Sequence, residues 1–387
     1  MRFCITVFLL ALVSLLSGKV MAQKGQPGTE SHFARGVELQ QRGDLTGARD
    51  AYLAALKLAP NRVDANANLG AVYVRLGQFD DAIRHYSRAL AVNPTQAAVR
   101  LHLGAACLQA GKLEAAREAF AAVVKATPLD LRARQLLAIA LLKLNRLQEG
   151  IAELEKVHQG QPDNREATYT LTSAYLRSRQ LDKAATIIGR GLDQSNTPEA
   201  NLLVGSYETA RHNYIRALAR LKTAQQQNPK LPGLHSALGH AYVLTGNRKL
   251  AVDMFQKELE ITADDFNSLA FLGWLYREDG RLEEAAKLLR KALAARPDEA
   301  GVLFQLAQIS QTQGTAEETA QLLERVVVLK PDHLASHVLL AQIYFKQKRL
   351  QDAQRERQII DRLNAQEQEK QPSTYDLRYT GVTVPLN

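Results

Sequence analysis

Residues 66–94, NANLGAVYVRLGQFDDAIRHYSRALAVNP, decide the fold of this chain. Apolar residues recur at intervals of three and four in two segments, 63–76 and 79–92, which predicts two amphipathic helices. Gly77 stands between the segments, where a glycine can adopt the left-handed conformation that closes the first helix. Pro94 prevents the second helix from continuing, because proline cannot supply the N–H that a helix needs. The stretch therefore predicts one helical hairpin.

The same pattern recurs every 34 residues over most of the 387-residue chain. In the fourth repeat Asn145 takes the place of Gly77, and asparagine can adopt the same left-handed conformation. The closing prolines fall into two registers, separated by one deleted residue between Arg165 and Thr197: Pro60, Pro94, Pro128 and Pro162, then Pro229, Pro297 and Pro331. A small-residue column holds Gly36, Gly70, Gly104, Ala138, Thr172, Gly205, Gly239, Gly273, Ala307 and Ala341. A large-residue column holds Tyr52, Tyr86, Phe120, Leu154, Ile188, Leu221, Phe255 and Leu289. Small residues let helices approach closely, and large ones fill the gap between neighbouring hairpins. Since one hairpin cannot bury both of its faces, we expect stability to come from stacking.

The pattern resembles the tetratricopeptide repeat. The residues that carry the resemblance are Leu69, Gly70, Tyr73, Ala82, Tyr86, Ala89 and Pro94, together with their equivalents in the other units. It implies an all-α fold, a right-handed α-α superhelical solenoid of about ten stacked helix-turn-helix units. The units are residues 29–62, 63–96, 97–130, 131–164, 165–197, 198–231, 232–265, 266–299, 300–333 and 334–367, so that the array spans 29–367.

Three units depart from the pattern. The fifth lacks its closing proline and has Gly191 where a small alanine is expected, the sixth has Glu208 where a large residue belongs, and the seventh ends at Ala263 without proline. We expect local irregularity at these places and not a break between domains. The second helix of the last unit, predicted over 350–365, becomes polar, as the terminal helix of a repeat array must.

Both ends of the chain differ from the repeats. Residues 1–22 combine a positive start, an uncharged apolar centre and small residues before a cleavage site, which is typical of a signal peptide; a retained membrane anchor is the alternative. A short linker, 23–28, follows. Residues 368–387 are predicted to form an irregular C-terminal tail. The tail is either a loose terminus or a strand that pairs with a partner or folds back onto the solenoid.

The predicted signal peptide implies export. We expect the mature chain to be soluble and to lie in the periplasm or cell envelope of a bacterium, or to be secreted. The formal net charge is +9, but acidic and basic residues alternate along most of the chain, which indicates a solvated surface; a patch for nucleic acid or anionic membranes is the alternative. Cys107 is the single cysteine beyond the signal, and we expect it to be buried without a disulfide partner.

No catalytic constellation stands out in the sequence. The motifs HExxH, GxSxG and GxxxxGK[ST] and metal-type CxxC pairs are all missing. His333 and His337 are four residues apart and could share one helix face, but no third ligand lies near them in sequence, so a metal site there stays only an alternative. We predict a protein that is not an enzyme and that binds no cofactor, no metal and no nucleic acid.

In proteins of the family that the repeats resemble, the first helices of the units line a concave face. Transferring this layout unit by unit gives a partner-binding groove of aliphatic, aromatic, amide and hydroxyl side chains. Its predicted residues are Phe33, Val37, Leu101, Arg132, Gln135, Ile139, Tyr169, Ser173, Leu202, Ser206, Ser236, His240, Ala270, Trp274, Phe304, Gln308, Val338 and Gln342. Trp274, the single tryptophan, is either an exposed anchor for a partner or a residue packed between units.

Some relatives grip an acidic C-terminal tail with lysine and asparagine at fixed groove positions. Apolar residues, among them Phe33, Ala67 and Leu101, occupy those positions here, so no such clamp is expected. An extended peptide or an amphipathic helix fits the groove better. The leading functional hypothesis is a non-enzymatic scaffold or adaptor that binds other proteins in the periplasm or at the cell envelope. The alternative is an auxiliary subunit of a polysaccharide synthesis, export or secretion machine.

Overall fold

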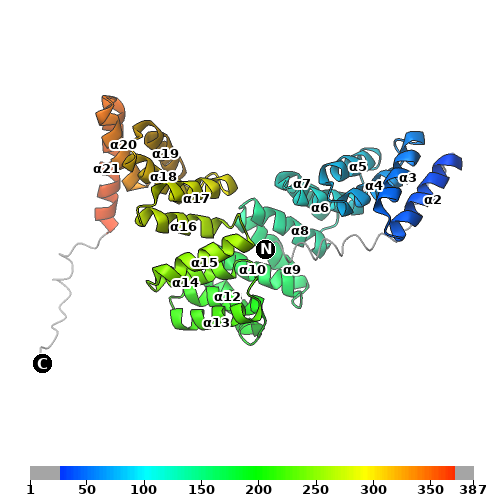
Figure 1. The fold of residues 1–387 in the computed structure, drawn as a ribbon, viewed down its shortest axis with the longest axis horizontal. Coiled ribbons are helices and arrows are strands. Elements are labelled where there is room, and N and C mark those ends of the chain that lie inside the picture. Colours follow the sequence, from blue (N-terminus) through cyan, green and yellow to red (C-terminus); the bar gives the residue numbers. More distant parts are fainter. Residues whose placement is uncertain (1–26, 371–387) are drawn as a thin grey trace, which may run out of the picture. The chain divides into compact units, whose positions relative to one another are not determined.

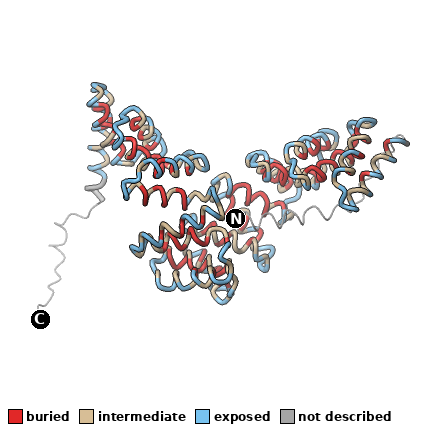
Figure 2. The backbone as a smooth tube through the Cα atoms, in the orientation of Figure 1, coloured by how far each residue is buried: buried red, intermediate tan, exposed pale blue. Residues whose placement is uncertain are grey.

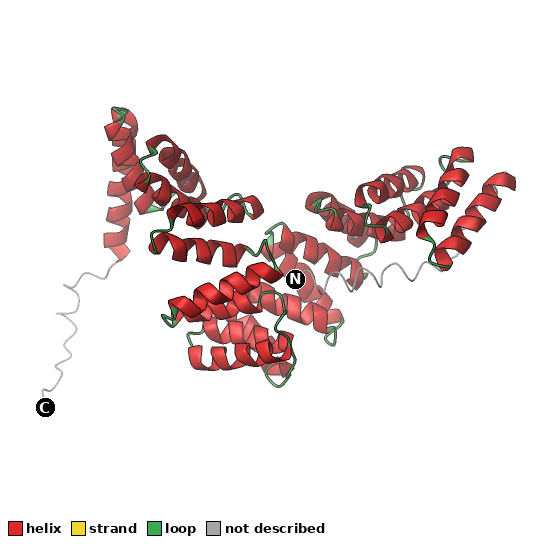
Figure 3. Cartoon of the chain, in the orientation of Figure 1, coloured by secondary structure: helices red, strands yellow, loops and turns green. Residues whose placement is uncertain are grey.

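The computed structural model describes residues 27–370 of the chain (Figure 1). Every regular element in this range is helical, and no strand occurs within it (Figure 3). Consecutive helices form pairs joined by short turns, and the pairs pack against one another along the chain. The predicted all-α architecture of stacked helical hairpins is confirmed.

Each repeat consists of a first and a second helix. The first helices are α2 (Pro27–Gln41), α4 (Val63–Arg75), α6 (Ala97–Gln109), α8 (Leu131–Lys143), α10 (Arg165–Arg177), α12 (Pro198–Ala210), α14 (Leu234–Leu244), α16 (Phe266–Glu278), α18 (Ala300–Thr312) and α20 (Leu334–Lys346). The second helices are α3 (Leu45–Leu58), α5 (Phe79–Val92), α7 (Leu113–Ala126), α9 (Leu147–Gly160), α11 (Leu181–Ile187, continued by the π-helical turn η2, Ile188–Leu192), α13 (Tyr214–Gln227), α15 (Arg248–Ile261), α17 (Leu282–Ala295), α19 (Ala316–Leu329) and α21 (Leu350–Lys370). Helix α2 begins before the first predicted repeat, and α21 continues past residue 367 into the segment assigned to the tail.

The chain divides into two compact units, residues 1–231 and 232–387, and the division falls between the sixth and seventh repeats. In the described part, the first unit contains α2 to α13 and the second contains α14 to α21. Inside each unit, every second helix contacts the first helix of the repeat that follows it in that unit. Buried residues line the helix faces that meet inside each stack (Figure 2). Stacking therefore supplies the core of each unit, as the repeat pattern predicted.

The small-residue and large-residue columns meet inside each hairpin. A Cβ added to Gly70 of α4 would lie 2.8 Å from the ring of Tyr86 on α5, which is closer than carbon atoms can pack. The Tyr86 ring is 2% exposed and also stacks with His102 of the next repeat, with 6.0 Å between ring centroids. The large residue thus fills the space between two neighbouring hairpins, as expected.

The sizes of the two columns are matched repeat by repeat. Glycine faces every aromatic member of the large-residue column: Tyr52, Tyr86, Phe120 and Phe255. Alanine or threonine occurs in the small-residue column only in repeats where the large residue is not aromatic. A flat ring needs the space that a Cβ would occupy. Leucine leaves room for a methyl group in some repeats, as Ala138 opposite Leu154 shows, but a Cβ added to Gly205 or Gly273 would lie 2.7 Å from Leu221 or 2.8 Å from Leu289.

The turns inside the hairpins adopt the left-handed conformation. Gly77 has a φ of 73° and Asn145 a φ of 60°, which confirms the prediction made for these turn residues. Arg179, His212 and Lys348 occupy the same conformation in the fifth, sixth and tenth repeats, with φ between 57° and 62°. A Cβ makes this conformation sterically strained, so arginine, histidine and lysine rarely adopt it. For that reason no local sequence signal marked these three positions.

A polar contact links the two helices of several hairpins, between residues that are 19 positions apart in the sequence. The pairs are Asn66 with His85 at 2.9 Å, Arg134 with Glu153 at 2.5 Å, Asn201 with Arg220 at 2.9 Å, and His337 with Glu356 at 2.5 Å. We call this recurring contact the polar tie. In the second repeat, His85 Nδ1–H donates to the amide oxygen of Asn66, and burial lowers the pKa of His85 to about 4, so the imidazole is neutral near pH 7.

The first member of the tie also reaches back to the preceding repeat. Asn66 Nδ2 donates to the carbonyl of Pro60 at 3.0 Å, and Arg134 Nε donates to that of Pro128 at 2.8 Å. His337 Nε2 lies 3.0 Å from the carbonyl of Pro331. The closing proline therefore has a second role: its carbonyl anchors the first helix of the next repeat. Proline keeps this acceptor although it lacks the donor.

The fifth repeat is irregular, as expected, whereas the sixth keeps two regular helices, α12 and α13. In the fifth repeat, α11 ends at Ile187 and the chain continues as a π-helical turn in which Gly191 has a φ of 151°. In the sixth repeat, Glu208 is buried and forms an ion pair with Arg216 at 3.2 Å. Its second oxygen accepts from Asn213 Nδ2 at 3.1 Å. The charge at this position is therefore paired within its own hairpin.

The seventh repeat begins with an unusual helix start. Gly233 precedes α14 with a φ of 84° and provides no side chain to cap the helix. The carboxylate of Glu258 on α15 replaces the cap and accepts from the backbone N–H of Gly233 at 2.7 Å, His235 at 3.1 Å and Ser236 at 3.4 Å. Glu258 is 0% exposed. Burial raises the pKa of Glu258, and the three amide donors oppose that rise.

Several predictions concern residues that the structure does not describe. The signal peptide (1–22), most of the linker and the tail from residue 371 lie outside the described range. Among the helices of residues 27–370, none has the length and apolar character needed to cross a membrane.

Cys107 is buried and forms no disulfide, and burial raises the pKa of its thiol, which confirms the interpretation of this residue as a small core side chain.

Candidate protein-binding surfaces

The predicted groove residues all lie on first helices, at positions separated by about one helical turn in most repeats. They belong to both compact units, so the residues from Phe33 to Ser206 form one set and those from Ser236 to Gln342 another. Arg132 and Gln342 are exposed, whereas most of the others are half-buried. Gln135, Ile139 and Ser236 are buried, and therefore their side chains do not present a contact surface.

In the first unit, two groove residues contact the residue that directly precedes the next first helix. The guanidinium of Arg62 lies 4.2 Å from the ring centroid of Phe33. The hydroxyl of Tyr169 lies 3.1 Å from that of Thr197. Each of these contacts joins a first helix to the start of the following hairpin. The half-buried groove side chains thus position neighbouring hairpins while keeping part of their surface accessible.

The second unit shows the same arrangement. The rings of His240 and Phe271 are 5.2 Å apart, and the ring of Phe304 meets His333 edge-on at 4.7 Å. Gln308 accepts a hydrogen bond from Arg277 of the preceding repeat. Half-buried aromatic and amide side chains therefore occur on each of the first helices α14, α16 and α18.

Trp274 takes one of the two roles that the sequence left open, because it packs between repeats. It is half-buried and packs against the core formed by α15, α16 and α17. The guanidinium of Arg248 lies 5.9 Å from its ring, and the same group donates to the carbonyl of Leu275 at 2.5 Å. Packing between repeats is thus shown for Trp274, and its role as a partner anchor stays a prediction.

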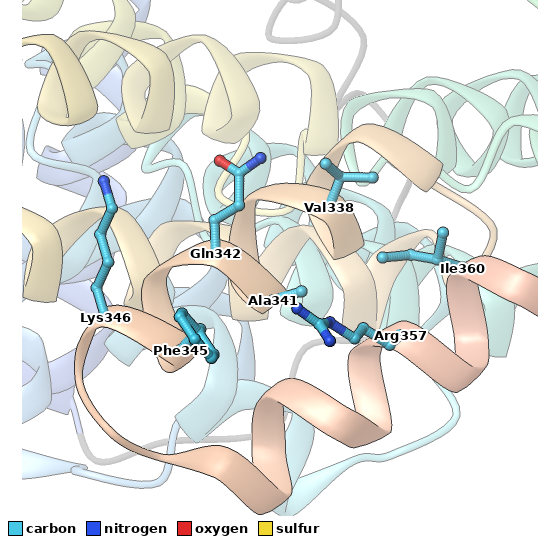
Figure 4. A pocket seen from close by; sticks show the side chains of 7 residues that line it. All are labelled: Val338, Ala341, Gln342, Phe345, Lys346, Arg357 and Ile360. Atoms are coloured by element: carbon cyan, nitrogen blue, oxygen red, sulfur yellow. The ribbon is translucent and has the colours of Figure 1, made fainter.

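A pocket of about 380 Å³ lies in the last repeat, between α20 and α21 (Figure 4). It is lined by Val338, Ala341, Gln342, Phe345 and Lys346 from α20 and by Arg357 and Ile360 from α21. Val338 and Gln342 belong to the predicted groove. Phe345, which is 57% exposed, and the wall from α21 were not predicted.

The pocket is apolar with two cations at its edge. Val338, Ala341 and Ile360 provide aliphatic surface, and the guanidinium of Arg357 lies 5.8 Å from the Phe345 ring. Within the described residues, neither Lys346 nor Arg357 forms an ion pair. The sequence did contain a signal for this site, because Arg357 falls in the large-residue column that is otherwise apolar.

His333 and His337, the two candidate metal ligands, form hydrogen bonds within the last repeats. His333 Nδ1 is hydrogen-bonded to Ser336 at 2.8 Å, and both ring nitrogens of His337 face acceptors on Glu356 and Pro331. No cluster of three or more metal-ligating side chains occurs within residues 27–370. These two histidines therefore serve the packing of the last repeat.

Comparison with protein families identifies the repeats. Models described as tetratricopeptide repeat match residues 68–130, 236–300 and 141–206, and a model described as TPR repeat matches residues 36–77. This chain is a tetratricopeptide repeat protein. Repeats of this family generally mediate protein–protein interactions, and its members are generally non-catalytic scaffolds. A model described as anaphase-promoting complex, cyclosome, subunit 3, matches residues 278–355 of the tetratricopeptide repeat protein.

Solved structures similar to this tetratricopeptide repeat protein include three with low sequence identity. The crystal structure of MamA is 14% identical, with a TM-score of 0.39, and the match covers 43% of this chain and 97% of that one. A tetratricopeptide repeat protein from Parabacteroides merdae is 15% identical, with a TM-score of 0.43 and coverage of 74% and 100%. The APC/C hetero-tetramer Cut9-Hcn1 is 12% identical, with a TM-score of 0.48 and coverage of 94% and 90%. No curated protein sequence matches the chain.

Proposed function

We propose that this protein is a non-enzymatic scaffold that binds other proteins through the exposed parts of its first helices. The observation that carries the proposal is the row of half-buried aromatic and amide side chains on the successive first helices α14, α16 and α18, which includes Trp274, Phe304 and Gln308. Aromatic side chains with one packed and one accessible side lose little entropy on binding and are common interface anchors. An extended peptide or an amphipathic helix fits such a row.

We further propose that the scaffold works in the periplasm or at the cell envelope. The signal-like residues 1–22 support this location. Fractionation of cells that express the full chain tests this location. Recovery of the protein in the cytoplasm with residues 1–22 intact would contradict it. If affinity purification recovers an export machine or a polysaccharide synthesis complex as the dominant partner, the protein is an auxiliary subunit of that assembly.

The groove is tested by affinity purification from envelope fractions with the full chain as bait. Trp274→Ala and Phe304→Ala are expected to reduce partner recovery about tenfold or more, as truncation of an interface anchor does. Ile215→Ala is the matched control, because Ile215 is 88% exposed on a second helix. Thermal unfolding of each variant verifies that the fold persists. Equal recovery of all partners by the folded variants and wild type would exclude the row as the interface.

A further inference from the structure

The last hairpin leaves open a position that is filled in the earlier repeats. The large-residue column is buried in all nine preceding repeats, and Ile188, at 5%, is its most exposed member. In the tenth repeat the equivalent residue is Arg357, which is exposed. Ile360 is half-buried, whereas its equivalents Val326 and Ala292 are 0% exposed. The difference arises on the side of α20 and α21 that carries the pocket.

The earlier repeats show what covers this side. Helix α17 contacts α18, and α19 contacts α20, so each second helix of this unit is covered by the next first helix. Arg277, the equivalent of Phe345 in the eighth repeat, reaches Gln308 on the first helix of the ninth. No further helix follows α21 among the described residues. We call the pocket between α20 and α21 the end slot.

We propose that the end slot binds an amphipathic helix of a partner protein that carries acidic side chains beside its apolar face. The inference rests on the proposed function as a protein-binding scaffold and assigns it a second surface. In the earlier repeats of this unit, a helix covers the surface that is equivalent to the slot. Its aliphatic lining and Phe345 suit the apolar face of such a helix.

The two cations of the slot, Lys346 and Arg357, favour an acidic partner. A helix seated in the slot would remove water from Lys346 and Arg357, and neither has an ion-pair partner within the described residues. Burying two unpaired cations is costly, so an incoming helix has to provide carboxylates. A guanidinium is well suited to such a partner, because its planar donors match a carboxylate in pairs.

Two other occupants meet this requirement less well. Residues 371–387 contain one acidic and one basic residue, Asp376 and Arg378, and thus bring no net negative charge from side chains. If a second copy of the chain filled the slot, the helix at the start of its array, α2, would occupy it. Its acids Glu30 and Glu38 already form ion pairs with Arg62 and Arg42. A separate acidic protein therefore fits best.

The proposal is tested with two fluorescein-labelled synthetic helical peptides that share one leucine and alanine face. One peptide has glutamates beside that face and the other has lysines. Fluorescence anisotropy with the full chain is expected to show the glutamate peptide binding about tenfold more tightly than the lysine peptide. Arg357→Glu is expected to remove or reverse this preference. Arg357→Leu restores the residue type of Leu323 and Leu289, and it is expected to fold and bind both peptides equally.

Arg362→Glu is the matched control, because Arg362 is exposed on α21 and does not line the slot. It is expected to change the preference less than twofold. Equal affinity of wild type for both peptides, or an unchanged preference in Arg357→Glu, would overturn the proposal. Tighter peptide binding after removal of residues 371–387 would assign the slot to the chain's own tail, and a dimer abolished by Phe345→Ala would assign it to a second copy. If only these peptide results fail, partner loss in Trp274→Ala still supports the proposed function.

Discussion

At the scale of single residues, the fold depends on a match between one small and one large side chain in each repeat. Gly70 and Tyr86 represent the aromatic version, and Ala307 and Leu323 represent the aliphatic one. Because both members are buried, neither can change size alone without strain or a cavity. This constraint explains why only glycine, alanine and threonine occur in the small-residue column.

Gly70→Ala tests this match with a single added carbon. The new Cβ would lie 2.8 Å from the buried Tyr86 ring, so we expect a loss of about 1–3 kcal/mol in the free energy of unfolding, measured by urea denaturation. Gly301→Ala is the control, because Gly301 also lies in a first helix but its Cβ would meet nothing within 4 Å. That change is expected to stabilise the protein by up to about 1 kcal/mol. Similar effects of the two substitutions would refute the match.

At the scale of elements, the sequence predicted most of what the structure contains. The apolar periodicity located the helices, and Gly77 and Asn145 marked turns, because these signals are local. The polar tie between residues such as Asn66 and His85 was not predicted. Its members vary from repeat to repeat, since asparagine, arginine or histidine occupies the first position and histidine, glutamate or arginine the second.

The end of the array was also missed in part. The sequence assigned Val338 and Gln342 to a groove, but the second wall of the end slot comes from α21. In the earlier repeats of this unit the next first helix covers the equivalent surface, and no further helix follows α21 among the described residues. Arg179, His212 and Lys348 adopt left-handed turns because tertiary packing holds them there. Burial of Gln135 and Ile139 likewise depends on the neighbouring repeat, which the transfer of a groove pattern does not include.

The start of α14 provides a prediction at this scale. Glu258→Ala places alanine where Ala224 and Ala292 stand in neighbouring repeats, yet it would leave the N–H groups of Gly233 and His235 without their acceptor. We expect a loss of about 1–3 kcal/mol in the free energy of unfolding. Hydrogen exchange of the first-turn amides of α14 should become faster at the same time. Glu260→Ala, an exposed neighbour on α15, is expected to change neither quantity; an equal effect of both substitutions would contradict the capping role.

At the scale of the whole molecule, ten hairpins in two compact units provide long rows of first helices and one open end slot. Half-buried aromatic residues such as Trp274 and Phe304 lie on first helices, and Phe345, Lys346 and Arg357 line the slot. The proposed function follows from repetition, since each added hairpin extends the surface on which partners can be held.

Site-specific photo-crosslinking in living cells tests most directly whether first helices bind partners. A photoreactive residue would replace Arg132 or Gln342, which are exposed on first helices, or Ile215 or Val328, which are 88% and 79% exposed on second helices. Mass spectrometry then identifies the proteins captured at each position. The account predicts that the first-helix positions capture the same partner proteins reproducibly and that the second-helix positions do not. Partner capture confined to Ile215 and Val328 would contradict it.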